Sequence, residues 1–561
     1  MINSKMKKIA LFATILATLF TSCEIDREPY DKYTEEQVKS DLTLLLNGSY
    51  SALKGYWGDN MHYAGEFCGD NVMKQAPSSD AWFEFISYKH TTTNYRMKNF
   101  WVYSYKIISQ TSDMFKTIEA GQSAEIDSKL GEGYFLRGMM YFYLCRTFGR
   151  PYYQDPDKNL GVPIVNGMPE DIINMELPDR ATVKETYQQA ISDLKKAEEM
   201  IGENKGAAYA SKEAAQALLS RIYLYMSGTY ENPNQTYADS AIYYAKKVID
   251  SGHYTLLDRA KFMKFNEMAP DDASQTETIF AVKRVSSEFS TDDSYSCIGG
   301  MYSTIDGIGW GEVYASAEYL DLLRESKGTN DARWAFIRQN YASDNDAFRF
   351  VAKVYKDGTQ TGYTYYQGLT SEKGGKLYVT LKEEEYPLTL VDAETNSYSI
   401  SYEGETYVGE RGKEMVLSNG YPQYFIIKCS LQEGETQLHS PIVARLSEMY
   451  LNLAEAYAKK GDYANALTNL NIVRERSIVG GAYKSLNASD AAQLINKERR
   501  LELAFEGQRG PDVFRIGETM RRHYPGIHDN MSEFAATDNK VVMYIPQDEI
   551  NAWPGTLTQN P

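Results

Sequence analysis

The sequence predicts a mainly α-helical fold, a scaffold of stacked helix pairs interrupted by one irregular region with short strands. Apolar residues recur at three- and four-residue steps in the N-terminal third and the C-terminal quarter of the chain, the spacing of helices that bury one face. Over residues 255–435 this periodicity fades, while Gly, Ser, Asp and Tyr become frequent. Because helix pairs bury their faces against neighbouring pairs, we expect both ends of the chain to build one scaffold around the region between them.

Capping signals and apolar faces predict the helices of the N-terminal part. Thr34 with Gln37, and Thr182 with Glu185, have the spacing of a capping box, in which two side chains satisfy backbone N–H groups at a helix start. The segment at residues 132–148 is apolar almost all round, so its helix should be buried. Further helices are expected near residues 99–118, 212–226 and 237–250, each from its apolar periodicity.

Helical signals return in the C-terminal part. Ser440 and Pro441 predict a helix start, because a capping side chain there precedes proline at the first helical position. Gly461 and Asp462 predict a turn into a second helix, and a last helix is expected over residues 491–506. These signals predict a helix pair followed by one more helix at this end of the chain.

One stretch of the C-terminal part resembles a known repeat. Residues 441–476 resemble a tetratricopeptide repeat, a helix–turn–helix unit of about 34 residues whose small side chains allow close packing. The pair at residues 182–227 is a more degenerate candidate for the same unit. This resemblance implies a tetratricopeptide-like helical-repeat scaffold assembled from separate parts of the chain.

The region between the helical parts carries two strand signals. Residues 376–381 and 398–402 alternate between polar and apolar side chains, and Gly-containing turns lie beside them. We therefore expect one or two hairpins within an otherwise irregular region.

The N-terminus has the order of a secretory signal. Lysines at positions 5, 7 and 8 precede an apolar run at residues 9–20, and small residues lead to Cys23. The apolar run is too short to cross a bilayer core of about 30 Å as a helix. Residues 19–23 resemble a bacterial lipobox, in which the cysteine is acylated and becomes the mature N-terminus. The alternative is an ordinary signal peptide in which Cys23 has no role.

The charge balance argues against several classes of partner. Removal of residues 1–22 takes away three lysines and no acidic residue, which moves the net charge from −17 to −20. An acidic chain is a poor candidate for nucleic-acid binding, because phosphate recognition depends on clustered Lys and Arg. The four remaining cysteines have no paired spacing, and we expect buried free thiols rather than one long-range disulfide: Cys68, Cys145, Cys297 and Cys429.

Several segments resemble the SusD/RagB family, in the order in which that family carries them. Residues 132–144, with the letters EGYFLRGMMYFYL, are similar to a characteristic family helix, and Phe148-Gly149 and residues 161–164 follow as expected. The segments 447–456, 470–476 and 495–509 and the chain end from Tyr544 to Pro561 also fit the family pattern. Residues 355–412 depart from it, because they are unusually rich in strand signals.

The resemblance implies a domain order and a function. It implies a signal peptide at 1–22, a lipidated tether at 23–35, helical parts at 36–254 and 436–561, and a ligand-facing region at 255–435. The protein would then be an outer-membrane lipoprotein, facing the cell exterior, that captures oligosaccharides or polysaccharide for a SusC-like TonB-dependent transporter. It would have no cofactor and no chemistry of its own. The alternatives are a RagB-like protein that captures peptides and a helical-repeat scaffold that binds only protein.

Aromatic residues on loops are the candidate binding residues, because sugars stack their C–H faces on flat rings that project from the surface. Ring residues at helical spacing, such as Phe100, Trp101 and Tyr103, are expected in the core instead. Glycines beside a loop residue permit the tight turns that direct its side chain outward. The stacking candidates are Trp82, Phe83, Tyr295, Tyr302 and Trp310, and the polar candidates are Asp70, Asn71, Asn94 and Asp306.

Charged and metal-binding residues give weaker signals. Glu498, Glu502, Glu506 and Arg509 share one helical side and could suggest acid–base chemistry, but we expect a structural ion-pair network. The histidines lack the spacing of a metal site, and even the closest pair, five residues apart at 523 and 528, is a poor match. We therefore expect no catalytic residue and no metal.

Overall fold

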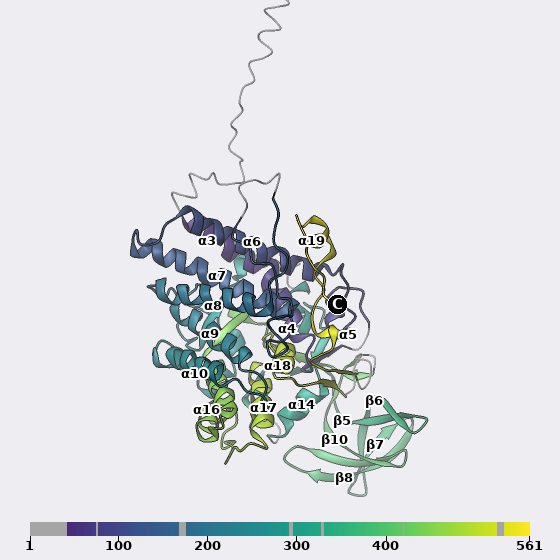
Figure 1. Ribbon diagram of the computed structural model, residues 1–561. Coiled ribbons are helices and arrows are strands. Elements are labelled where there is room, and N and C mark those ends of the chain that lie inside the picture. Colours follow the sequence, from purple (N-terminus) through teal and green to yellow (C-terminus); the bar gives the residue numbers. More distant parts are fainter. Residues whose placement is uncertain are drawn as a thin grey trace, which may run out of the picture. The chain divides into compact units, whose positions relative to one another are not determined.

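Helices from both ends of the chain form most of the structure, and a barrel of strands is inserted between them (Figure 1). The computed structural model describes residues 42–74, 77–167, 175–290, 295–326, 330–418, 420–523 and 532–561. The chain divides into two compact units, residues 1–44 and 45–561, and the features below belong to the second. The expected signal peptide, Cys23 and the Thr34–Gln37 capping box lie outside the described residues.

The predicted N-terminal helices are present. The structure has α3 (Leu42–Ala52), α4 (Gly58–Glu66), α6 (Tyr95–Thr117), α7 (Ala124–Phe148), α8 (Val183–Met200), α9 (Lys212–Met226) and α10 (Gln235–Asp250). The capping box that opens α8 is confirmed, because Thr182 Oγ1 accepts from the Glu185 N–H while the Glu185 carboxylate accepts from Thr182. Within the described residues, no helix is both long and apolar enough to cross a membrane.

Helix α7 is buried as predicted, and it lies close against α8. Along α7 the apolar side chains from Phe135 to Leu144 are almost fully buried. Gly138 makes the close approach possible, because a Cβ there would lie 2.9 Å from the carbonyl oxygen of Ala190 in α8. A small residue at this crossing therefore sets the distance between the two helices.

The predicted helix start at Ser440 and Pro441 is wrong. The next residues form the strand β14 (Ile442–Arg445), which pairs with β2 (Thr278–Ala281) and is buried along its whole length. Helix α15 (Leu446–Lys459) begins only after this strand. The apolar run Ile442-Val443-Ala444 suits both a buried strand and a helix, and the partner β2, far away in sequence, selects the strand.

The rest of the C-terminal part follows the prediction more closely. Gly461, at φ +77°, turns the chain from α15 into α16 (Tyr463–Ser477), and the two helices share a core that includes Leu451 and Leu470. Helix α17 (Ala491–Leu503) ends three residues earlier than expected, because Phe505 and Gly507 adopt positive φ angles. The short helix α18 (Arg509–Arg515) follows.

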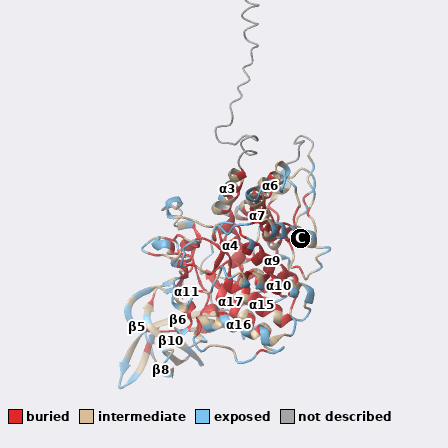
Figure 2. Cartoon of the chain, turned by 90° about the vertical axis from the view of Figure 1, so that its left-hand side faces the viewer, coloured by how far each residue is buried: buried red, intermediate tan, exposed pale blue. Residues whose placement is uncertain are grey.

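Helices from the two ends of the chain pack directly on one another. Helix α15 contacts α9 and α10, although more than 190 residues separate them in sequence. Arg221 of α9 and Glu448 of α15 form a fully buried ion pair, with Arg221 Nε 2.6 Å from a carboxylate oxygen. Figure 2 shows that buried residues concentrate in this helical region, whereas much of the barrel is exposed.

The expected irregular region with one or two hairpins contains a closed barrel, which occupies residues 341–415. Its order is β10-β5-β6-β7-β8-β9, and its core includes Phe348, Phe350, Val379 and Ile400. The strands are β5 (Tyr341–Lys356), β6 (Thr359–Lys373), β7 (Lys376–Leu381), β8 (Glu384–Asp392), β9 (Ser397–Tyr402) and β10 (Glu405–Met415). The two strand signals in the sequence match β7 and β9. The closing pair, β10 with β5, joins residues too distant for local alternation to reveal.

Candidate functional site

A glycine-rich turn holds Trp310 at the surface. The turn follows the short helix α13 (Ile298–Tyr302), and Ile305 and Ile308 exchange backbone hydrogen bonds across it. The backbone N–H of Trp310 donates to the Gly300 carbonyl at 2.7 Å, which fixes the main chain. Gly309 has φ +101°, and a Cβ there would lie 2.3 Å from the Ser303 carbonyl oxygen. The indole of Trp310 is 48% exposed, so a rigid backbone presents an open aromatic face.

Polar groups flank this indole. Asp306 is exposed at the tip of the same turn, with φ +51°. Glu312, two residues after Trp310, is partly exposed and its carboxylate lies 2.6 Å from Lys74 Nζ. Carboxylate oxygens accept hydrogen bonds, so Asp306 and Glu312 can bond to ligand hydroxyls at the rim, whereas Lys74 is buried beneath them.

Trp82 lies near this turn but is not a stacking platform. The Lys74 Nζ that pairs with Glu312 also lies 5.2 Å from the centre of the Trp82 ring. Trp82 is only 1% exposed, and its ring packs edge-on against the buried Phe67. The prediction for Trp82 is therefore corrected: the residue belongs to the core beneath the loops.

The other predicted aromatic residues divide in the same way. Tyr302 is fully buried, and its hydroxyl forms a 2.7 Å hydrogen bond with His62 Nε2, so its predicted stacking role is also corrected. Phe83 and Tyr295 are half-buried, and their binding roles stay predictions. Phe100 and Trp101 are in the core, as predicted.

Three of the four polar candidates are structural. Asp70 is buried and forms an ion pair with Arg509 at 2.6 Å; burial raises its pKa, but the charges of Arg500 and Arg509 outweigh this and hold the pKa below its ordinary value. Asn71 is fully buried, donates to Glu66 and accepts from Arg500. Asn94 caps α6 by accepting from two backbone N–H groups. Only the fourth candidate, Asp306, is exposed.

The sequence analysis missed polar residues beside the turn. Tyr95, 48% exposed at the start of α6, donates its hydroxyl to Asp80, which also forms an ion pair with Arg96. The Arg96 guanidinium lies 5.1 Å from the Tyr63 ring centre, and the Tyr63 hydroxyl donates to the Ser296 carbonyl. This places the start of α6 next to the segment that leads into α13. The signal in the sequence is Asn94, a capping residue that marks a helix start and so places Tyr95 and Arg96 in the first turn, at the end of the helix.

We give the name Trp310 surface to seven exposed or partly exposed side chains: Asp80, Tyr95, Arg96, Tyr295, Asp306, Trp310 and Glu312. Asp80 precedes α6 and is bound by Tyr95 and Arg96 of that helix, whereas the other four residues lie before or after α13. The contacts of Tyr63 with Arg96 and with Ser296 link these two parts of the chain. One open aromatic ring surrounded by hydrogen-bonding groups is an arrangement that recognises polyhydroxylated ligands.

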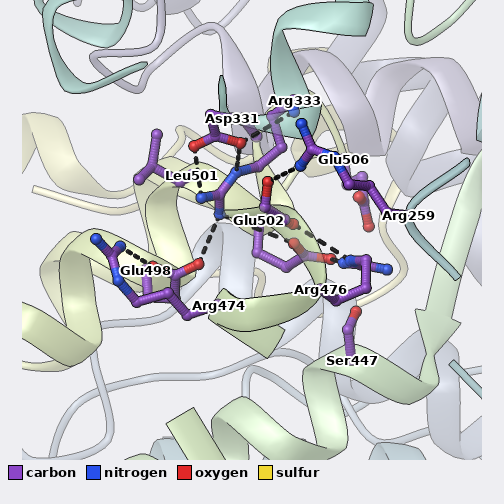
Figure 3. A network of polar contacts seen from close by, with 12 residues as sticks. Arg259, Asp331, Arg333, Ser447, Arg474, Arg476, Glu498, Leu501, Glu502 and Glu506 are labelled. Carbon is purple, nitrogen blue, oxygen red and sulfur yellow. Dashed lines mark hydrogen bonds and ion pairs between the residues drawn. The ribbon is translucent and has the colours of Figure 1, made fainter. Parts of the chain in front are cut away.

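The charged cluster of α17 is a buried ion-pair network, as predicted. Arg333 contacts Asp331 and Glu498 at 2.7 Å, and Arg474 contacts the second oxygen of Glu498 (Figure 3). Glu502 and Glu506 are paired with arginines in the same network. Burial raises the pKa of Glu502, but Arg476, Arg445 and Arg333 outweigh it and lower the pKa below its ordinary value. Carboxylates held ionised and enclosed by guanidinium groups brace helix ends against strands.

The cysteines and histidines agree with this picture. Cys68, Cys145, Cys297 and Cys429 are all buried free thiols, as predicted. Among the described residues, no group of three or more His, Cys, Asp or Glu side chains is arranged to hold a metal ion. One of the paired histidine positions, 528, lies outside the described part of the chain.

Fold and site together describe a mainly helical scaffold that carries a barrel and presents one aromatic surface on a rigid turn. A family model described as "Starch-binding associating with outer membrane" matches residues 25–224, and the model of the SusD family matches residues 276–561, more than half of the chain. The chain therefore belongs to the SusD family.

Known proteins support this assignment. A SusD-like protein from Bacteroides ovatus is 20% identical over 231 residues, and the chain spans 40% of the length of that relative. A SusD superfamily protein from Bacteroides thetaiotaomicron has a TM-score of 0.69 at 24% identity, covering 93% of this chain and 99% of its own. A SusD-like carbohydrate binding protein from Bacteroides vulgatus has a TM-score of 0.63 at 18% identity, covering 92% and 97%. At these identities the structures show a shared fold.

Proposed function

We propose that this protein is a cell-surface lipoprotein that captures oligosaccharides or polysaccharide and passes them to a TonB-dependent outer-membrane transporter. The observation that carries the proposal is Trp310, an open indole on a turn whose backbone is fixed by hydrogen bonds. The family description as starch-binding and associated with the outer membrane supports it. So does the name of the Bacteroides vulgatus structure, a carbohydrate binding protein.

The Trp310 surface binds by stacking and by hydrogen bonding. A sugar ring lays its C–H face on the indole, and this contact removes apolar area from water on both partners. Asp306 and Glu312 accept hydrogen bonds from sugar hydroxyls, and Arg96 donates to them. Because the turn is already ordered before the ligand arrives, binding loses little conformational entropy.

Capture and handover need no chemistry in this protein. The carboxylates that could suggest acid–base catalysis are buried and enclosed in ion pairs with arginines, and the charges of those arginines hold the pKa of Glu502 below its ordinary value. The acylated Cys23 anchors the chain to the outer membrane, facing outward, through the tether at residues 23–35. The tetratricopeptide-like helical repeats act as the rigid support, and a SusC-like transporter is the partner that receives the sugar.

The experiment is calorimetric titration of the purified protein with neutral, amino-sugar and acidic oligosaccharides and with a mixed peptide pool. We expect saturable binding of at least one oligosaccharide, weakened about tenfold or more by Trp310→Ala, as for an aromatic binding anchor. Tyr243→Ala is the matched control, because Tyr243 is 54% exposed on α10 and does not belong to the Trp310 surface. Both variants should melt like the wild type. Peptide binding without sugar binding would move the protein to the peptide-capturing branch.

A further inference from the structure

A second cleft lies between the barrel and helix α14 (Ala317–Arg324). It consists of two adjoining cavities of about 250 and 490 Å³, which share Arg324, Ser397 and Glu410 in their linings. Helix α14 forms one wall of the smaller cavity, and the barrel strands β9 and β10 contribute to both. The volume of the larger cavity lies within the range of sites that hold small molecules, roughly 300–1,000 Å³, and the smaller cavity extends it. None of the residues in this cleft belongs to the Trp310 surface.

The charges at the junction of the two cavities balance. Glu410 accepts from Arg324 at 2.9 Å and from Arg349 at 2.6 Å, and Arg324 also forms an ion pair with Asp321. Burial raises the pKa of Glu410, but the two arginines outweigh it and lower the pKa to about 2, so the carboxylate stays ionised. Arg324 and Glu410 both remain partly exposed, which leaves donor and acceptor atoms open to the cleft. A charged ligand would be attracted by one of these groups and repelled by its neighbour of the other sign.

The walls of the larger cavity combine an aromatic ring with short polar and apolar side chains. Trp334 is half-buried, and the Arg324 guanidinium lies 5.9 Å from its ring centre. Ile337 and Gln339 are alternate residues of β4 (Ile337–Gln339), so both point to the same face. Val408 of β10 lines the smaller cavity and is 60% exposed, which marks an open rim.

This lining selects for uncharged polyhydroxylated ligands. Balanced guanidinium and carboxylate groups bond to adjacent hydroxyls, and the indole and Val408 contact C–H faces. We propose that the cleft between α14 and the barrel is a second carbohydrate subsite, which binds neutral sugar residues and rests on the proposed capture function.

The paired strands β13 and β4 connect the Trp310 surface with the cleft. The ring of Phe425 in β13 (Tyr424–Ile426) lies against Gly311, the residue after Trp310. Phe425 pairs with Arg338, which lies between the cleft residues Ile337 and Gln339 in β4. Two subsites on one connected surface bind a long glycan more tightly than either does alone, because the second contact is intramolecular.

The test is calorimetric titration with neutral malto-, xylo-, cello- and mannohexaose and with charged hexagalacturonate, on the full purified protein. We compare the wild type with Trp334→Ala, Trp310→Ala and the double variant. For the hexaose that binds, each single variant should lose affinity about tenfold, as for a single aromatic anchor. The double variant should show no detectable binding of that hexaose. For hexagalacturonate, Trp334→Ala should leave the affinity unchanged.

Two further variants keep the test decisive. Val408→Glu adds a charge at the rim of the cleft and, at a surface position, leaves folding intact; it should weaken hexaose binding as Trp334→Ala does. Tyr355→Ala changes an exposed barrel residue outside the cleft and should bind like the wild type. Wild-type affinity in Trp334→Ala and Val408→Glu would overturn the subsite and leave the capture function standing. If no sugar binds the wild type, both proposals fail.

Discussion

Arg445 shows how strongly single residues constrain this molecule. Its side chain is 1% exposed and donates to the carboxylates of Glu277 at 2.7 Å, Glu502 at 2.6 Å and Glu506 at 3.0 Å. Three carboxylates from a strand connection and from the end of α17 thus share this cation, and each also has a second partner, Arg476 for Glu277 and Glu502 and Lys428 for Glu506. A buried cation in this position fixes their mutual placement more than it adds net stability.

Replacement of this cation should destabilise the fold strongly. We expect Arg445→Met to lower the free energy of unfolding by about 3–5 kcal/mol, because it removes the central cation from three buried carboxylates and leaves Arg476 and Lys428 to balance them. Urea denaturation followed by circular dichroism measures the change. Lys413→Met, which breaks the exposed ion pair with Asp344 on the barrel, is the control and should unfold like the wild type. An equal loss in the two variants would contradict the structural role of Arg445.

His62 predicts how stability depends on pH. Burial and the charge of His439 lower its pKa to about 3; Lys428 acts in the same direction and Glu506 against it. The unfolded chain keeps a histidine pKa of about 6.5. The contribution of neutral His62 to the free energy of unfolding is therefore complete above pH 6.5. It is lost as the pH falls from there towards 3, by at most about 1.4 kcal/mol per pH unit.

Denaturation at a series of pH values tests this contribution. The free energy of unfolding should fall between pH 6.5 and pH 4, and His62→Gln should reduce the slope without abolishing it. Part of the slope remains because His90 and His439 also have lowered pKa values, about 4 and about 3, mainly through burial. An unchanged slope in His62→Gln would show that His62 does not titrate differently in the folded and unfolded chains.

Single residues also mark the limit of the sequence analysis at the site. Trp310 is exposed as predicted, yet Trp82 and Tyr302 stand in equally loop-like sequence and are buried. Composition and glycine content predict a turn, but they do not predict whether an aromatic side chain of that turn points into the core or into solvent. Phe67 and His62, which enclose those two rings, come from α4 and its end, so only the tertiary arrangement decides.

At the scale of elements, the contact between α7 and α8 depends on a side chain that is absent. Gly138→Ala would place a Cβ 2.9 Å from the carbonyl oxygen of Ala190 and 3.0 Å from Leu194 Cγ. Because the backbone of α8 cannot easily move away, we expect this overpacking to lower the free energy of unfolding by about 1–3 kcal/mol. Thermal unfolding measures it. Gly202→Ala is the matched control, since a Cβ there meets nothing within 4 Å, and equal melting of both variants would contradict the close approach.

Elements were predictable where their signals are local. The capping box at Thr182 and the apolar faces locate α8, α9 and α10, because helix hydrogen bonds stay within the helix. Strands need partners, and the partners of β14 and β10 lie far along the chain. Local signals at Ser440 and Pro441 therefore predict a helix start where a strand forms, and local alternation reveals only two of the barrel strands.

At the scale of the whole molecule, the accessibility of the four buried thiols to a reagent shows whether the protein is folded. Burial raises the pKa of Cys68 and Cys145 to about 12 and that of Cys297 to about 11, so the reactive thiolate is scarce. In protein that lacks Cys23, Ellman's reagent should find no reactive thiol in the native state. It should find all four after denaturation with guanidinium, and fewer would indicate a disulfide.

The pair of Arg221 and Glu448 has a consequence for biosynthesis. While the ribosome is still making residues 255–435, α9 already exists but its buried guanidinium has no carboxylate to meet. Unpaired, this charge penalises premature compaction of the first half of the chain. The core around this pair can therefore close only after α15 has been made.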